Sequence, residues 1–326
     1  MKMAGFIVLS CDRCNRIRKM IKETPEVNTL SELLGATPPK PQLVVTTKGI
    51  DLGLDISLGD WNNSSLLSRP SALLAIEHGE NLFELMDKEL GLVGINEEGV
   101  IKSNIIIELD PHKTTMRILG KIAEALIVEE CEKNAKQNEN WALLAKRYTP
   151  FTDSLSNYKA VGTGLNYTKI NYPTKYQPND TQRDIVWIDK RDPLSQLLIS
   201  APTSNSGIQA GIQVKVSANG LNYLSPMDFS SRRYEVPIVY FDLNNDFFEI
   251  QMKIVNSGID SVYGMDYHRG RNISPEIHEK LCAYYNLIYS IIIGDMKLEA
   301  LLLNEEALKG YVTEIKDRQG KRIIVT

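Results

Sequence analysis

The chain has 326 residues, of which 43% are hydrophobic and 24% charged, as is typical of a folded globular protein. No apolar run approaches the roughly 20 residues that cross a bilayer, so we expect no membrane-spanning helix. The short apolar stretch near the start is followed at once by charged residues, which favours a buried strand over a signal peptide. The sequence therefore predicts a cytoplasmic protein with reduced thiols. Cys11 and Cys14 form a lone CxxC, which is a weak signal for either zinc or redox chemistry.

The net charge of −4 is distributed unevenly along the chain. Residues 146–235 carry 11 basic and 7 acidic side chains, whereas the segments on either side are net negative. A phosphate-contacting surface requires a local positive region of this kind. An excess of this size also arises by chance and decides nothing alone.

Short elements alternate over the first hundred residues. We expect a strand at 6–10, a helix at 15–23, a hairpin at 41–58 and a helix at 81–90 that ends at Gly91. The glycines of GLVGINEEGV mark the best candidate boundary. This pattern predicts two domains, residues 1–100 and residues 101–326.

The second part of the chain predicts a mixed α/β protein with a central sheet. Helices are expected at 115–136, where Thr114 or Thr115 is a possible cap, and at 138–148 and 275–294. Strands are expected at 105–110, 158–172, 183–189, 211–217, 236–243 and 247–255, with a terminal hairpin at 311–326.

Two of these strands carry polar residues where a buried strand is expected to be apolar. Asp184 opens RDIVWID, and the next four residues are Ile, Val, Trp and Ile. In GIQVKVS, Gln213 and Lys215 alternate with aliphatic residues, so strand geometry places both on one face. If the two strands are neighbours, a carboxylate, an amide and an ammonium group converge at one point.

This trio suits the hydrolysis of a phosphodiester bond. A carboxylate and a second oxygen ligand can hold Mg²⁺, which prefers oxygen donors and keeps several waters. The metal stabilises charge on the phosphate and helps to make hydroxide from water. A nearby lysine can orient or deprotonate the attacking water and stabilise the developing charge. The backbone carbonyl of Val214 is a further possible ligand.

The same residues carry a resemblance to a known superfamily. An acidic residue that opens one strand, followed by (D/E)-x-K in the next, is the signature of PD-(D/E)XK nucleases. The tripeptide at 213–215 resembles the Q-x-K variant of Mrr-like nucleases and of some restriction and homing endonucleases. The resemblance covers roughly residues 115–255 and does not explain residues 1–100. It implies a restriction-endonuclease-like central mixed β-sheet flanked by helices, to which this chain adds an N-terminal α+β recognition or regulatory module.

The resemblance also implies roles for individual residues. Asp184 would bind the metal, Gln213 would be the second ligand and Lys215 the catalytic lysine, with Mg²⁺ as the cofactor and Mn²⁺ as a substitute. The family core has a preceding helix that supplies a glutamate, and GKIAEALIVEECEK lies upstream in the right order. Glu124 best matches the family spacing, whereas Glu129 falls within the apolar side of a helical wheel. We favour Glu124 and keep Glu129 as the alternative.

The sequence departs from the family pattern at several positions. Arg183 stands where the family has proline, and Asp189 and Asp192 are rival acids, although a regular strand turns Asp189 away from Lys215. Glutamine in place of an acid lowers the negative charge of the site. A structural polar pair, or a degenerate site, is therefore the alternative interpretation.

Basic residues that flank the proposed centre are the best candidates for contacts with DNA phosphates. They are Lys190, Arg191, Arg232 and Arg233. The polar loop at 202–209 is either a flexible connection or a source of side chains that read base edges. His268, in YHRGRN, is expected either in a plain surface loop or against a phosphate.

These expectations combine into a Mg²⁺-dependent endodeoxyribonuclease that cuts double-stranded DNA, of the type II-like restriction class. A non-catalytic DNA-binding or assembly protein on a degenerate nuclease fold, or a phage or mobile-element nuclease, is the alternative. We expect a homodimer, because two copies of one site cut both strands symmetrically. The apolar helix at 275–294 is expected either to pack on that partner or to cover the sheet within one chain.

Overall fold

The structure is a computed structural model that describes residues 42–47, 50–57, 69–95, 101–149, 154–199, 207–220, 224–229 and 234–302. Internal contacts divide the chain into two units. The first comprises residues 1–87, 91–115 and 282–326, and the second comprises residues 88–90 and 116–281. The predicted functional domains, 1–100 and 101–326, remain a prediction. The strand expected at 6–10, the helix at 15–23 and the hairpin at 311–326 lie outside the described residues.

The first unit contains two antiparallel hairpins and a helix. Strands β1 (Gln42–Thr47) and β2 (Ile50–Ser57) pair as predicted from their glycine turns. Strands β3 (Val93–Ile95) and β4 (Ile101–Ser103) form the second hairpin. Helix α4 (Arg69–Glu84) continues into the π-helical turn η1 (Leu85–Glu89), which confirms the predicted helix. Gly91 follows with a φ of 61°, a left-handed conformation that suits glycine and ends the helix.

Helix α5 (Pro111–Lys133) begins earlier than predicted, and the strand expected at 105–110 is wrong. Ile106 and Ile107 in that segment are 73% and 59% exposed, so the apolar run is not a buried strand. Asp110 Oδ1 accepts the His112 N–H at 2.9 Å and acts as the cap, in place of Thr114 or Thr115. Proline at the first helical position after an aspartate is the start signal, and it outweighs the β-branched run before it.

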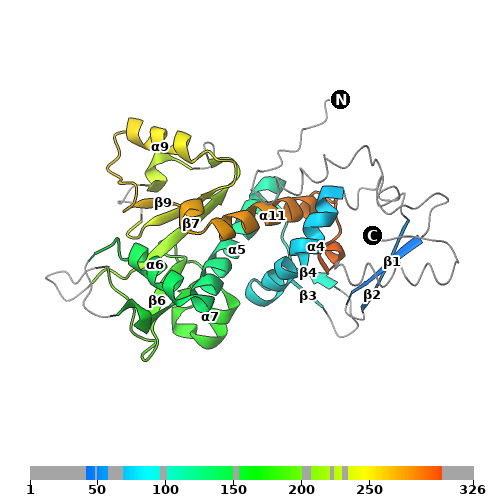
Figure 1. Cartoon of the computed structure of the whole chain (residues 1–326), viewed down its shortest axis with the longest axis horizontal. Coiled ribbons are helices and arrows are strands. Elements are labelled where there is room, and N and C mark those ends of the chain that lie inside the picture. The colour runs from blue at the N-terminus through cyan, green and yellow to red at the C-terminus, as the bar shows by residue number, and fades with distance from the viewer. Residues whose placement is uncertain are drawn as a thin grey trace. The chain divides into compact units, whose positions relative to one another are not determined.

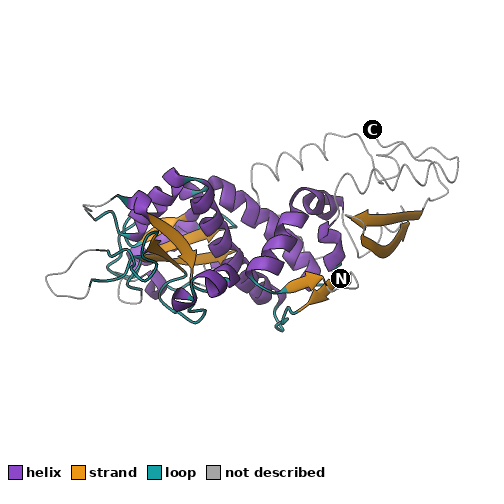
Figure 2. Ribbon diagram, turned by 90° about the horizontal axis from the view of Figure 1, so that it is seen from below, coloured by secondary structure: helices purple, strands orange, loops and turns teal. Residues whose placement is uncertain are grey.

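The second unit is built on a five-stranded mixed sheet in the order β5-β6-β7-β8-β9. Strands β5, β6 and β7 pair antiparallel, whereas β7–β8 and β8–β9 pair parallel. Helices flank the sheet, as Figure 2 shows. The bounds are β5 Tyr158–Gly162, β6 Ile185–Asp189, β7 Gly211–Ser217, β8 Ile238–Asp242 and β9 Tyr267–Arg269. A mixed α/β architecture with a central sheet is confirmed.

Two segments predicted as strand are helical. The residues predicted as strand 247–255 form α9 (Phe247–Asn256), and the second half of the segment 158–172 contains α7 (Asn166–Asn171). In α9 the buried residues are Phe247, Ile250 and Ile254, which share one face at helical spacing. The β-branched and aromatic composition favoured a strand, but this spacing matches a half-buried helix at the edge of the sheet near β9 (Figure 1).

The remaining helices agree with the sequence. Helix α6 (Ala135–Ala145) is the predicted second helix, and α11 (Pro275–Ile292) starts after Ser274 as expected. Most of the apolar residues of α11 are buried. Packing of this helix on a partner, or over the sheet, stays a prediction. No helix in the described part of the chain is long and apolar enough to cross a membrane. The short elements are α10 Gly270–Ile273, η2 Leu155–Asn157, η3 Pro173–Lys175, η4 Pro226–Phe229 and η5 Leu298–Leu302.

One face of the sheet carries two apolar clusters that are separated by polar side chains. Val161, Val186 and Ile188 pack together with Tyr172 on the β5–β6 side. Ile238 and Tyr240 of β8 belong to a larger cluster that includes α9 and Tyr267. In the parallel register Ile238 lies beside Gln213 and Tyr240 beside Lys215. The polar residues of β7 therefore share this face and lie between the two clusters.

Asn138 of α6 links β5 and β6 through hydrogen bonds to both strands. Its side-chain nitrogen donates to the Tyr158 carbonyl of β5 at 2.8 Å. Its oxygen accepts the Nε1–H of Trp187 in β6 at 3.0 Å. Trp187 is fully buried, so this indole N–H has no access to water.

We expect Asn138→Ala to lower the free energy of unfolding by about 1–3 kcal/mol, because it leaves buried hydrogen-bonding groups without a partner. Urea denaturation measures this change. Asn140→Ala on the same helix is the matched control, since Asn140 is exposed and bonds only Gln137 among the hydrogen bonds described. Equal stability of the two variants would contradict the anchoring role of Asn138.

Candidate active site

Asp184 lies directly before β6, and its side chain is held by the neighbouring strand. Its Oδ2 accepts the Gln213 Nε2–H at 2.6 Å and the Val214 backbone N–H at 2.7 Å. Both Asp184 and Gln213 are buried. The structure thus brings the predicted carboxylate and amide into direct contact across the β6–β7 junction.

Backbone contacts from both neighbouring strands fix the position of Asp184. The Thr163 N–H, just after β5, donates to the Asp184 carbonyl at 2.8 Å, and Thr163 Oγ1 donates to the Arg183 carbonyl at 2.9 Å. The Asp184 N–H donates to the Ile212 carbonyl at 2.9 Å. The main chain at 183–184 is therefore bonded on both sides before the carboxylate is oriented.

Lys215 lies two residues after Gln213 on the same face of β7. It is partly exposed, and its Nζ lies 5.4 Å from the centre of the Tyr234 ring. At this distance the ammonium group is attracted by the face of the aromatic ring. Tyr234 thus helps to hold the lysine at the edge of the site, and no sequence signal pointed to it.

Glu124 of α5 is the helix glutamate that faces this site. It is only 3% exposed, whereas Glu129 is paired with Lys133 on a more open part of the helix. The helical wheel favoured Glu129 and was wrong, because every residue from Ile122 to Val128 is buried. Burial on all sides of a helix removes the amphipathic pattern on which such a wheel depends.

The surroundings of the two carboxyl groups favour their protonated forms. Burial and, after it, the charge of Asp184 raise the pKa of Glu124 to about 8, against the opposing effects of Lys121 and Lys215. Burial also raises the pKa of Asp184, opposed by the Val214 N–H and by the same two lysines. Two carboxylates held in a buried site favour the arrival of a cation.

Gln213 adds an oxygen atom that also favours a bound cation. Its Nε2 faces the carboxylate of Asp184, and its buried Oε1 has no hydrogen-bond partner among the described residues. A buried acceptor left without a donor costs about 1–3 kcal/mol, and a bound cation would remove that cost. Two carboxylates and an amide oxygen form the kind of hard donor set that suits Mg²⁺ or Mn²⁺.

The proposed donor set contains few acidic groups. Within the described residues no group of three or more His, Cys, Asp or Glu could hold a metal ion. The site has two carboxylates and Gln213 in place of a third. Val214 donates its N–H to Asp184, and a ligand role for its carbonyl remains a prediction.

Lys121 is a site residue that the sequence reasoning missed. Its Nζ donates to both carboxylate oxygens of Glu124, at 2.8 and 3.0 Å. Burial alone would lower the pKa of Lys121, but the charges of Glu124 and then Asp184 raise it. The spacing of three residues between Lys121 and Glu124 on a helix was the available signal.

The rival acids and nearby basic residues lie away from this centre. Asp189 accepts hydrogen bonds from Arg191, and Asp192 bonds Ser195 in the following turn. Lys190 is exposed and donates to the Ser156 carbonyl at 2.6 Å. Arg191 is exposed as well and is paired with Asp189, so both basic side chains lie on the surface at the end of β6.

His268 contradicts both sequence expectations. It is buried in β9, where it is neither in a surface loop nor available to a phosphate. Burial lowers its pKa to about 4. The polar sequence YHRGRN did not indicate the short strand that lies at the end of the sheet.

Several other residues singled out from the sequence lie outside the described residues. They are Cys11, Cys14, Arg232, Arg233 and most of the loop at 202–209.

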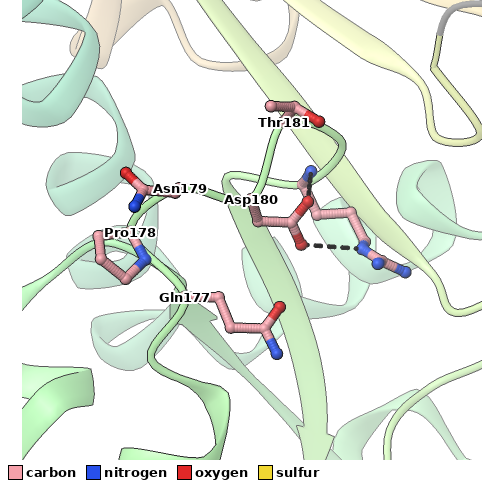
Figure 3. A pocket seen from close by; sticks show the side chains of 6 residues that line it. Gln177, Pro178, Asn179, Asp180 and Thr181 are labelled. Carbon is pink, nitrogen blue, oxygen red and sulfur yellow. Dashed lines mark hydrogen bonds and ion pairs between the residues drawn. The ribbon is translucent and has the colours of Figure 1, made fainter.

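The segment that leads into Asp184 lines an open polar hollow of about 450 Å³ (Figure 3). Asp180 is turned toward Arg183, with Oδ2 accepting from Nε at 3.3 Å, while the Gln177 and Asn179 amides take no part in that ion pair. Arg183 also donates to Gln209 at 3.0 Å. The position that the family fills with proline thus holds an arginine that braces this segment.

Comparison of the chain with protein-family models, with curated proteins and with solved structures gave no match. What the site does therefore has to be argued from its own chemistry.

The raised pKa of Glu124 predicts a pH-dependent stability. Between the ordinary carboxyl range and about pH 8, the folded protein holds a proton on Glu124 that the unfolded chain releases. This contribution is greatest at low pH and is lost as the pH rises toward about 8, so it lowers the free energy of unfolding from pH 5 to pH 8. His268 contributes in the opposite direction, since its lowered pKa favours folding at higher pH.

Comparison of the parent protein with Glu124→Gln isolates the contribution of Glu124. We expect the stability difference between Gln variant and parent to grow in favour of the variant from pH 5 to pH 8. Urea denaturation in EDTA measures it, with Glu129→Gln as the control because Glu129 is partly exposed. A constant difference across this range would show that Glu124 titrates normally.

Proposed function

We propose that this protein is a metal-dependent endodeoxyribonuclease of the PD-(D/E)XK type. The observation that carries the proposal is the buried Asp184–Gln213 contact, in which Gln213 Oε1 has no donor within the described part of the chain. Lys215 follows on the same strand face, and Glu124 comes from the upstream helix. These four groups are the ones that the resemblance assigns to metal binding and catalysis.

The fold supports the proposal at the level of architecture. The polar residues lie on adjacent strands of a mixed sheet flanked by helices, with α5 before them in the chain. A restriction-endonuclease-like fold is the proposed assignment of that sheet. Adjacent strands explain how residues 29 positions apart, Asp184 and Gln213, share one site.

Asp184, Gln213 and Glu124 would hold the divalent cation through oxygen atoms. Bound Mg²⁺ or Mn²⁺ would neutralise charge on the scissile phosphate and acidify water. Lys215 is at the open edge of the site, where its ammonium group can orient the attacking water and stabilise negative charge on the phosphate. Tyr234 keeps that ammonium from folding back, and Thr163 keeps Asp184 in register.

DNA is the proposed substrate, and its backbone would extend from the site to basic residues that lie beyond it. Lys190 and Arg191 flank the end of β6, and Arg232 and Arg233 come after β7 in the sequence. The amides of Gln177 and Asn179 in the open hollow add polar groups that suit contacts with phosphate or base edges. A type II-like restriction enzyme is the proposed setting, with a phage or mobile-element nuclease as the alternative.

One observation favours a second candidate function, a non-catalytic DNA-binding or assembly protein on the same fold. Gln213 replaces an acid, and Lys121 already neutralises Glu124. A site that has lost metal binding would show these same two features. The activity of the centre is therefore the deciding property.

We expect Lys215→Ala and Asp184→Ala to abolish cleavage of a long, varied DNA substrate. Lys215 acts on the transition state, so its loss should lower the rate much more than DNA binding. Asp184→Ala should also weaken Mg²⁺ binding, because it removes a charged ligand. Gln213→Glu should stay active, since a carboxylate replaces an amide oxygen of similar reach. Nicking of plasmid DNA in Mg²⁺ and in Mn²⁺ gives the rates, and binding is followed separately in Ca²⁺.

Asp189→Ala is the matched control, because Asp189 lies on the same strand but bonds Arg191. It should cut at close to the parent rate. Cleavage by both Asp184→Ala and Lys215→Ala at the parent rate would refute the proposed site. A parent protein that binds DNA but never cuts it would favour the second candidate function.

A homodimer remains part of the proposal, and helix α9 offers a surface for it. Phe248, Met252 and Val255 form a stripe on α9 and are 70%, 57% and 64% exposed. Glu249 and Lys253 lie four residues apart on one flank of that stripe. Two such helices packed antiparallel around a two-fold axis would bring Glu249 of one copy toward Lys253 of the other. Self-complementary charge beside an exposed apolar stripe favours a second copy of this chain.

We expect light scattering at micromolar concentration to give twice the chain mass for the parent and a monomer mass for Phe248→Glu. The substitution places a carboxylate on the apolar stripe without touching the core. Leu194→Glu is the control, since Leu194 is also 70% exposed but lies in the loop after β6. A monomeric parent, or a dimeric Phe248→Glu, would exclude α9 as the interface.

A further inference from the structure

The carboxylate of Glu124 already has a cationic partner within the protein. Lys121 Nζ lies 2.8 and 3.0 Å from the two oxygens of Glu124, so both are engaged by one ammonium group. The charge of Asp184 also acts on the Lys121 ammonium group and, like that of Glu124, raises its pKa. Lys121 therefore occupies the place in this site that a positive ion favours.

We propose that Lys121 is an internal competitor of the divalent metal ion and must leave Glu124 before the metal can bind there. This inference rests on the proposed function, because it concerns the regulation of the same site. The Glu124 side chain is 4% exposed, whereas the Lys121 side chain is 35% exposed. The lysine thus has a route to solvent, and the glutamate does not. A lysine that swings outward would carry its charge toward the mouth of the site.

Gly164 provides the space in which the ammonium group sits. A Cβ atom added at Gly164 would lie 2.7 Å from Lys121 Nζ but 3.7 Å from Glu124 Oε2. The first distance forces the flexible end of the lysine to move, and the second is an ordinary contact. Gly164→Ala therefore displaces the ammonium group while it keeps the charge of Lys121 and the carboxylate of Glu124.

This geometry gives two independent variants, one that removes the charge and one that moves it. Lys121→Met removes the competitor, and Gly164→Ala displaces it. We expect Lys121→Met to raise the affinity for Ca²⁺ and Mn²⁺ about 10- to 100-fold, the range expected for loss of a competing hydrogen bond to a charged group. Gly164→Ala should raise it in the same direction by less, because the lysine stays nearby.

The measurement is isothermal titration of the full chain with Ca²⁺, and with Mn²⁺ followed by electron paramagnetic resonance, both without DNA. Gly120→Ala is the matched control, since an added Cβ there meets nothing within 4 Å. Lys215→Met tests for a general effect of charge, because it removes a lysine that acts on both acids without bonding Glu124 in the contacts described. Circular dichroism and the unfolding midpoint report whether each variant folds.

Raised affinity in Lys121→Met and Gly164→Ala, with Gly120→Ala unchanged, supports the proposal. It is overturned if Lys121→Met binds metal no better than the parent, or if Lys215→Met matches it while Gly164→Ala does nothing. Should Lys121→Met not fold, the result for Gly164→Ala decides. If the parent cleaves DNA and these variants show no gain in affinity, only this inference fails. If neither the parent nor any variant binds metal or cleaves DNA, the proposed function fails with it.

Discussion

The contact between Asp184 and β7 is the interaction on which the rest of the site depends. One carboxylate oxygen accepts both the Gln213 side-chain amide and the Val214 backbone N–H. Because one bond comes from a side chain and the other from the main chain, they fix the carboxylate relative to the strand as well as to its neighbour. The orientation of Gln213 follows, since only its nitrogen can face a carboxylate. Its oxygen thereby faces away from that carboxylate and meets no donor among the residues that the structure describes.

Burial of an ionised carboxylate is unfavourable, and the groups around this site either add to that free-energy cost or oppose it. Asp184 and Glu124 are both buried, burial raises the pKa of each, and the charge of Asp184 raises that of Glu124 further. Lys121 and Lys215 oppose this effect from two different elements, a helix and a strand. The apolar clusters on either side lower the local polarity around the two acids, which strengthens the effect of each charge. Two acids opposed by two lysines make a site that is close to balance without a metal.

Much of this architecture follows from local patterns in the sequence. The alternation in GIQVKVS and the polar start of RDIVWID predicted two strands, and the sequence order put Asp184 and Gln213 within reach. The predictions failed for segments in which the amino-acid composition and the spacing of the apolar residues indicate different structures. In α9 the β-branched content favoured a strand, but the spacing of its buried residues is helical. The prediction for His268 failed because a three-residue strand at the edge of a sheet is too short to show an alternating pattern of apolar residues.

The partners of the site could not be predicted because they depend on contacts that no local pattern encodes. Lys121 gains its role from the open space at Gly164, a residue about forty positions away in another element. A glycine there reads as a bend in a strand, yet its missing side chain is what admits the ammonium group. In the proposed metal site, Gln213 in place of an acid would make such a lysine tolerable, because a third carboxylate would hold the metal too firmly for an ammonium group to compete. On that proposal the glutamine and the lysine belong together, as two features that would each weaken the hold of the site on its cation.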